Sequence, residues 1–137
     1  MTRNKNGFTL LELLVVLAIM GLLAAIVAPQ VLRYLGSSKS QAAKVQIANI
    51  VASLDQFQVD VGRYPFPEEG LDVLVKIAPS AANWNGPYLT SATGLNDPWG
   101  ARYLYRIPGK TGKPFDVVTL GSDHAEGGSG EAKDVSN

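Results

Sequence analysis

The fold is decided by the stretch Gly7-Phe8-Thr9-Leu10-Leu11-Glu12 and by the unbroken apolar run over residues 13–29 that follows it. Glu12 is the only ionisable side chain between Phe8 and Leu32. At about 1.5 Å per residue, a helix over residues 8–29 is about 33 Å long, which is enough to cross the hydrocarbon core of a bilayer. The sequence therefore predicts a membrane-spanning helix over residues 8–29.

Arg3 and Lys5 precede this apolar segment. Because positive charge is enriched on the cytoplasmic side of membrane helices, they place the amino terminus in the cytoplasm and the chain after residue 30 on the other side. A plain single-pass anchor and a cleaved secretory signal peptide are two interpretations of such a segment. The apolar run is longer than the apolar region of about 7–15 residues in most signal peptides, and neither interpretation accounts for Glu12. A carboxylate inside a membrane costs on the order of 3 kcal/mol and usually has a functional partner.

Residues 7–12, with a short basic leader before them and an apolar helix after them, closely resemble the processing site of type IV pilin-like proteins. The resemblance implies that a prepilin peptidase cleaves after Gly7, so that residues 1–7 are a leader, and that Phe8 is then methylated. It also implies that Glu12 pairs with the terminal amine of a neighbouring subunit and that Pro29 loosens the helix. A carboxylate in an apolar bundle would gain a compensating ammonium in this way.

The helix is predicted to continue to residue 61, because no strong helix breaker comes before Gly62. Its second half carries an apolar stripe at helical spacing, formed by Ala43, Ile47, Ile50, Leu54, Phe57 and Val61. Two heptads are too short to argue for a coiled coil, so we expect this stripe to be buried against the rest of a small domain.

From Gly62 onward, proline and glycine divide the chain into short pieces. A short helix is possible over residues 71–77, and strands are predicted over residues 101–107 and 114–120, joined through residues 108–113 as a hairpin. The predicted class is α+β. A long amino-terminal helix, membrane-spanning in its first half and amphipathic in its second, packs on a small carboxy-terminal antiparallel β-sheet with an acidic, glycine-rich loop.

Tyr64-Pro65 after the long helix, Asp97-Pro98-Trp99-Gly100 before the hairpin and the acidic loop at the end together resemble the major pseudopilins of type II secretion systems. The resemblance covers essentially the whole chain. Tyr64 and Trp99 need be no more than core aromatic residues with a polar tip in water.

The terminal loop over residues 120–134 places four carboxylates among four glycines. Hard cations such as Ca²⁺ are bound by six to eight carboxylate and carbonyl oxygens, although the spacing here is not that of an EF-hand. In the resembling family this loop holds a structural Ca²⁺, which implies a set of ligands drawn from Asp123, Asp134, Glu131, Leu120 and Ser122. His124 and Lys133 depart from the family pattern. The alternative is a solvated acidic tail.

The composition excludes much enzyme chemistry. The 137 residues contain 12 Lys and Arg, 12 Asp and Glu, one His and no Cys. Without Cys there is no disulfide, thiolate metal site or Cys nucleophile, and the single His124 cannot form a multi-His site. Zero net charge favours neither nucleic acid nor anionic lipid, and no phosphate-binding Gly-Lys-Ser/Thr motif is present. We therefore expect no enzymatic activity and no nucleic-acid partner.

The resemblance implies the precursor of a major pseudopilin that is held in the inner membrane, with its domain over residues 30–137 in the periplasm. It implies a homo-oligomeric helical fibre, contacting membrane lipid, minor pseudopilins and an inner-membrane assembly platform, whose growth helps drive folded proteins across the outer membrane. Head-to-tail contacts that do not close into a ring produce such fibres. The alternatives are a type IV pilus or competence-pilus subunit, and a membrane-anchored periplasmic binding protein or enzyme.

Overall fold

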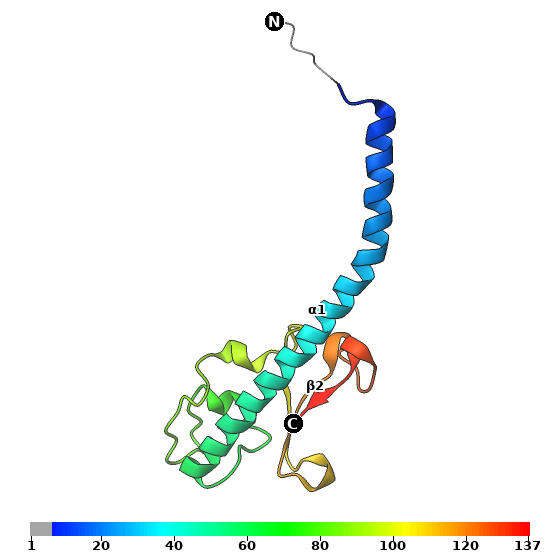
Figure 1. The fold of residues 1–137 in the computed structure, drawn as a ribbon. Helices are drawn as coiled ribbons and strands as arrows, with labels where there is room; N and C mark the ends of the chain where they lie inside the picture. The colour runs from blue at the N-terminus through cyan, green and yellow to red at the C-terminus, as the bar shows by residue number, and fades with distance from the viewer. Residues whose placement is uncertain (1–6) are drawn as a thin grey trace, which may run out of the picture. The chain divides into compact units, whose positions relative to one another are not determined.

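The computed structural model describes residues 7–137, apart from the side chain of Thr111. Its first element is the helix α1, Leu10–Val61, so the single long helix predicted from the sequence is confirmed (Figure 1). Thr9 caps its amino terminus, because the Thr9 Oγ1 accepts a hydrogen bond from the Glu12 N–H at 3.2 Å. The helix ends at Val61, and the next residue, Gly62, has a φ of +84° that suits glycine and donates its N–H to the Gln58 carbonyl at 2.8 Å. Residues 1–6 of the predicted leader lie outside the described residues.

Contacts within the chain divide it between Leu35 and Gly36 into two compact units. In the first unit, all the described residues are exposed, and Pro29 lies inside α1. This part of α1 is long and apolar enough to cross a membrane, with a mean hydropathy of 2.9 over 18 residues, none of them buried. An apolar helix that the rest of the described chain leaves exposed is stable when lipid or other helices cover it.

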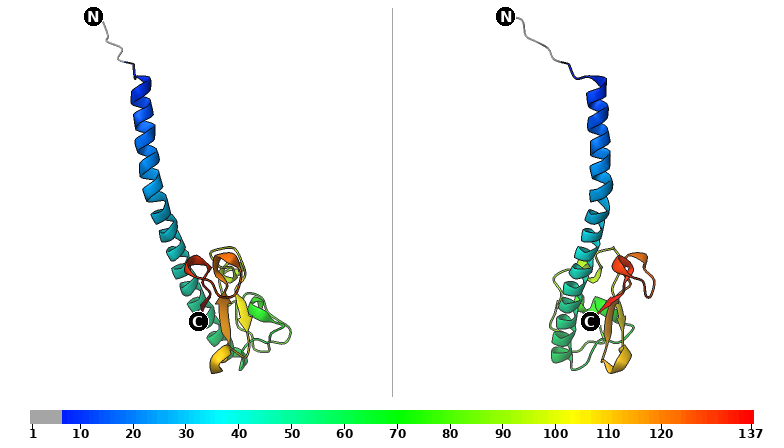
Figure 2. Two further views of the ribbon diagram at one scale, coloured as in Figure 1. Left: turned by 90° about the vertical axis from the view of Figure 1, so that its right-hand side faces the viewer. Right: turned by 45° about the vertical axis from the view of Figure 1, so that its right-hand side comes forward.

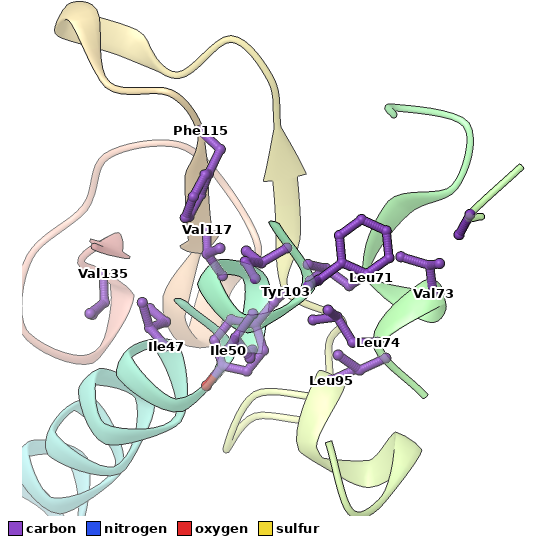
Figure 3. Close-up of a cluster of buried hydrophobic side chains, with 13 residues drawn as sticks. Ile47, Ile50, Leu71, Val73, Leu74, Leu95, Tyr103, Phe115, Val117 and Val135 are labelled. Carbon is purple, nitrogen blue, oxygen red and sulfur yellow. The ribbon is translucent and has the colours of Figure 1, made fainter. Parts of the chain in front are cut away.

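The second unit, Gly36–Asn137, holds the hydrophobic core. The predicted stripe on α1 faces this core. Five of its six members are buried, and Val61 is half-buried. Figure 3 shows side chains of α1 meeting side chains from the strands and from the short helices. Phe57 is fully buried and stacks edge-on against Tyr88, with ring centroids 5.7 Å apart. The stripe is thus a core face of a small domain, as the sequence predicted.

A three-stranded antiparallel sheet packs on α1 in the order β1-β2-β3. The strands are β1, Leu104–Arg106, β2, Asp116–Thr119, and β3, Val135–Ser136. The predicted hairpin is confirmed, with Tyr105 opposite Val117 at its centre. Both predicted strands are shorter than expected, and β3, which pairs Val135 with Thr119, was not predicted. Two residues between a glycine-rich loop and the end of the sequence carry too little pattern to indicate a strand.

Five short 3₁₀ helices complete the unit: η1, Gly70–Leu74, η2, Ala92–Leu95, η3, Lys110–Gly112, η4, Gly121–Asp123, and η5, Gly130–Ala132. The helix considered over residues 71–77 is therefore shorter and of 3₁₀ type. The helix stops at Leu74 because the Leu74 carbonyl accepts hydrogen bonds from the Tyr88 and Leu89 N–H groups, at 2.7 and 3.1 Å. A carbonyl used by a distant segment is not available to extend the helix.

Candidate functional site: the amino-terminal segment and the terminal loop

The segment around the predicted cleavage point is exposed. Gly7 and Phe8 precede the first turn of α1, and Phe8 is 83% exposed. A Cβ atom built on Gly7 would meet nothing within 4 Å, and Gly7 has no positive φ. Nothing within residues 7–137 therefore requires glycine at position 7, and a requirement for glycine there would come from outside this part of the chain.

Glu12 lies in the first turn of α1, where the helix dipole favours a carboxylate. Its backbone N–H is bound by Thr9, and within the described residues its exposed carboxylate has no hydrogen-bond or ion-pair partner. Thr9 and Glu12 have the Thr-x-x-Glu spacing of a capping box. This local signal for the start of a helix is present in the sequence. The structure leaves the carboxylate available to a group outside the described chain.

Pro29 interrupts the backbone hydrogen bonds of α1 because it has no N–H. Its own carbonyl lies 3.4 Å from the Nε of Arg33, which donates to it from one turn further along. The helix nevertheless continues through Pro29 in this structure.

The terminal loop is closed on itself by contacts between its backbone segments. Asp134 and Gly127 exchange two hydrogen bonds, from the Asp134 N–H to the Gly127 carbonyl at 3.2 Å and from the Gly127 N–H to Asp134 Oδ2 at 3.1 Å. Gly121 has a φ of +70°, and a Cβ there would lie 2.5 Å from the Glu131 carbonyl oxygen. The backbones of η4 and η5 therefore touch, which only glycine permits.

Of the predicted metal ligands, Asp123 lies in η4 and Asp134 directly precedes β3. Asp123 is exposed in η4 beside Leu120 and Ser122, and its Oδ1 accepts a hydrogen bond from the Ala125 N–H at 3.1 Å. Asp134 is half-buried, and its Oδ1 is buried without a hydrogen-bond partner among the described residues. An unpaired buried carboxylate oxygen is costly, and a bound cation would satisfy it. In this respect Asp134 fits a metal ion.

The Glu131 side chain contacts α1. Its carboxylate lies against the backbone of α1 at Gly36, where a built Cβ would be 2.0 Å from Glu131 Oε1. Within residues 7–137, no three Asp, Glu or His side chains gather closely enough to hold a metal ion. A metal site in this loop would therefore depend on backbone carbonyls as well as on Asp123 and Asp134.

A buried hydrogen-bond network fixes the start of the loop, and sequence reasoning did not identify it. Asp97 is 6% exposed, and its Oδ1 accepts the N–H groups of Trp99 and Ala101 at 3.0 and 2.9 Å. The Thr119 hydroxyl donates to Asp97 Oδ2 and accepts the Gly121 N–H at 3.2 Å. Asp97 thus links the Asp-Pro-Trp-Gly turn to the loop. The sequence signal for this network was an Asp at the start of a turn that contains Pro and Gly. An Asp in that position favours hydrogen bonds from its side chain to the backbone N–H groups that follow it.

The two aromatic residues that carried the resemblance differ at their polar tips. Tyr64 has the predicted core ring and polar tip. Its ring packs on Phe115 with centroids 4.8 Å apart, and its hydroxyl donates to Asp55 Oδ1 at 3.0 Å. Trp99 does not, because its Nε1 is buried and has no hydrogen-bond partner among the described residues. Neither residue lies among groups with an evident catalytic role.

Beyond the end of α1, an Arg63–Glu69 ion pair holds the next segment in place. The Arg63 guanidinium donates to both Glu69 oxygens at 2.7 and 2.9 Å. The Phe66 N–H donates to Glu69 Oε2 at 2.7 Å, and the Ser80 hydroxyl donates to Oε1. The Arg63 hydrogen bonds, opposed by burial and helped by Ser80 and Phe66, lower the pKa of Glu69 from 4.5 to about 2.

Residues 30–137 match the family model "Type II secretion system (T2SS), protein G", and residues 2–28 match the "Prokaryotic N-terminal methylation motif". The chain belongs to the type II secretion system protein G family. The resemblance found in the sequence is thereby confirmed over both parts of the chain.

Relatives and a solved structure agree with this family. The chain is 42% identical over 138 residues to "Type II secretion system core protein G" of Pseudomonas aeruginosa, covering 98% of this chain and 96% of the relative. It is 38% identical to the protein of the same description from Vibrio cholerae, covering 98% and 92%. It also resembles the crystal structure of the major pseudopilin from the type 2 secretion system of enterohaemorrhagic Escherichia coli. The TM-score is 0.60 at 26% identity, covering 74% of this chain and 87% of that one.

Proposed function

We propose that this protein is the major structural subunit of a type II secretion pseudopilus and not an enzyme. The observation that carries the proposal is the first part of α1, which joins an exposed carboxylate to an apolar helix that no described residue of the chain buries. Such a helix is stable in lipid or in a bundle of identical helices, and Glu12 would need a cationic partner in either place. A neighbouring subunit would supply both the apolar contacts and the cation.

The proposed topology has the amino terminus in the cytoplasm and the second unit, Gly36–Asn137, in the periplasm. Copies of the subunit leave the inner membrane and assemble into a helical fibre, together with minor pseudopilins and the assembly platform. The growing fibre helps to move folded proteins across the outer membrane. This chain lacks a nucleotide-binding motif, so energy would come from another component.

Processing by a prepilin peptidase after Gly7, followed by methylation of Phe8, creates the proposed assembly-competent subunit. The exposure of both residues and the absence of any internal need for glycine at position 7 support this step. Cleavage leaves an amine at Phe8, four residues before Glu12. The amine of one subunit would then neutralise the Glu12 carboxylate of the next.

The processing step is tested by mass spectrometry of the protein purified from membranes. We expect the mature chain to begin at a methylated Phe8 and Gly7→Val to remain uncut. Gly21→Ala is the matched control, because a Cβ at this helical glycine also meets nothing within 4 Å. An uncut Gly7→Val protein that still supports secretion would refute the proposal.

The assembly role is tested with Glu12→Gln, which keeps the shape of the side chain and removes its charge. We expect processing to continue while fibre assembly, measured by shearing and electron microscopy, is lost. A simple membrane anchor would tolerate both Glu12→Gln and Glu12→Ala. Normal fibres from either variant would therefore contradict the proposed pairing.

We also propose that the terminal loop binds a structural Ca²⁺ through the Asp123 and Asp134 carboxylates and the Leu120 and Ser122 carbonyls. The unpaired buried Asp134 Oδ1 supports this proposal. When bound, the ion would offset the repulsion between these carboxylates and hold η4 and η5 together.

Thermal unfolding of the full-length protein in non-ionic detergent, with Ca²⁺ or with a chelator, tests the site. At a Ca²⁺ concentration 100 times Kd, the expected stabilisation is about 2.7 kcal/mol. Asp123→Asn and Asp134→Asn should lose it. Glu126→Gln is the control from the same loop, since Glu126 is instead paired with Arg106 at 2.9 Å. An identical melting temperature with Ca²⁺ and chelator would leave the loop as a solvated acidic segment.

A further inference from the structure

The terminal loop rests on α1 at its only glycine within residues 36–61. Gly36 is buried, and the Glu131 side chain covers its backbone. A Cβ built on Gly36 would lie 2.0 Å from Oε1, 2.1 Å from Cγ and 2.3 Å from Cδ of Glu131. Any larger residue at position 36 would thus displace the whole end of the Glu131 side chain.

The contact extends along α1 beyond Gly36. Ser40 and Lys44 of α1 line a cavity of about 310 Å³ together with residues of the loop and of β3, among them Asp134. Val135 then joins Ile47 in the hydrophobic core, as Figure 3 shows. In both views of Figure 2, the orange and red terminal segment lies beside the cyan part of α1.

Charge and helix propensity both fit this contact. Residues 36–50 of α1 contain Lys39 and Lys44 and no acidic residue, so an acidic loop is attracted to this part of the helix. Glycine inside a helix is unfavourable relative to alanine, which indicates that Gly36 has another role. Close approach of a side chain to the helix backbone is such a role, and the neighbouring Ser37 and Ser38 make this stretch a weak helix former.

We propose that Glu131 is a positioning residue that docks the terminal loop onto α1 at Gly36, and that it is not a ligand of the loop's metal ion. The docking contact stands without the ion, while its coupling to ion binding rests on the Ca²⁺ site proposed above. Ordering of the loop by Ca²⁺ then stabilises α1 over residues 36–40, where the second unit of the chain begins.

A double-mutant cycle on the full-length protein in non-ionic detergent tests the docking. Gly36→Ala in the Glu131→Ala background should raise the melting temperature of the second unit by about 4 °C, because only the gain in helix propensity remains. In the parent protein the same substitution should leave the melting temperature unchanged or lower, because it also expels Glu131. Combination with Glu126→Ala, another acid of the loop, is the control and should show no coupling.

Hydrogen exchange gives a local measurement of the same contact. Both Gly36→Ala and Glu131→Ala should speed exchange of the loop amides at residues 130–134 by about fivefold, whereas Glu126→Ala should leave them unchanged. Equal effects of Gly36→Ala with and without Glu131, together with unchanged exchange in the loop, would overturn the docking proposal.

Ca²⁺ titrations of the same variants separate docking from ligation. Glu131→Ala should bind Ca²⁺ within about threefold of the parent, while Asp123→Asn should weaken binding more than tenfold. A tenfold loss in Glu131→Ala, with additive effects in the cycle, would make Glu131 a ligand and overturn the proposal. If the parent itself shows no response to Ca²⁺, the metal site and its coupling to α1 are refuted, and the cycle still decides whether Glu131 docks the loop.

Discussion

Protonation of Glu69 should destabilise the segment that follows α1. The Glu69 side chain is 6% exposed and that of its partner Arg63 is 25% exposed. Its carboxylate accepts hydrogen bonds from Arg63, Phe66 and Ser80, and these hold its pKa at about 2, below the ordinary 4.5. A neutral carboxyl group would lose the ion pair, and of the three residues that contact it only Ser80, through its hydroxyl, could accept its proton.

The sign and the size of the effect follow from the two pKa values. The pKa of Glu69 is lower in the folded state than in the unfolded state. Glu69 therefore stabilises the folded state fully above pH 4.5, its pKa in the unfolded chain, and this stabilisation is lost as the pH falls toward about 2. At about 1.4 kcal/mol per pH unit, this interval corresponds to about 3 kcal/mol of unfolding free energy. Partial exposure of Arg63 reduces the expected effect to about 2 kcal/mol.

The assay is urea denaturation of the full-length protein in non-ionic detergent between pH 7 and pH 2, followed by tryptophan fluorescence. Trp84 is a suitable reporter, since its Nε1 donates to the Val73 carbonyl at 2.7 Å inside the same unit. Glu69→Gln should be about 2 kcal/mol less stable than the parent at pH 7, and the difference should vanish near pH 2. Glu68→Gln, a change to the exposed neighbour, is the control.

Other carboxylates also titrate in this range, so the difference between the parent and Glu69→Gln is the informative quantity. If this difference is the same at pH 7 and at pH 2, protonation of Glu69 does not control the stability and the reasoning is refuted. If Glu68→Gln shows the same pH dependence as Glu69→Gln, the effect belongs to the general charge of the region.

Three further predictions concern the core, the loop and the start of α1. Phe57→Ala should cost about 3–5 kcal/mol in urea denaturation, because Phe57 is fully buried, and a loss under 1 kcal/mol would contradict its place in the core. Thr119→Val should cost about 1–3 kcal/mol by leaving buried partners at Asp97 and Gly121 unpaired, with faster amide exchange at Gly121 as the local sign. Thr9→Val should lower helix stability by about 1 kcal/mol and speed exchange in the first turn, while Thr9→Ser should not.

The long helix and its two halves were predictable because the information is local. Apolar residues without interruption predict a membrane helix, and recurrence at three and four residues predicts a face such as Ile47, Ile50 and Leu54. Both patterns repeat over many residues, so errors at single positions do not alter the result. The hairpin was predicted for the same reason, although its strands are shorter in the structure.

Side-chain partners far apart in sequence were not predictable. The carbonyl of Leu74 ends η1 because Tyr88 and Leu89 reach it, and β3 exists because Val135 pairs with Thr119. No pattern within a single segment contains such information, since each hydrogen bond depends on how two distant segments meet.

The sequence by itself determined the family, the long apolar segment at the start of α1, the position of Glu12 and the acidic character of the terminal loop, because these depend on residue identity and local spacing. Only the tertiary structure decided how the carboxylates of that loop are used. It left an oxygen of Asp134 buried and without a partner among the described residues, paired Glu126 with Arg106, and placed Glu131 against the backbone of Gly36. The physical reason is that carboxylates with the same charge in one stretch of sequence have different environments in the folded chain. Packing determines which of them contacts water, a cation or a helix backbone.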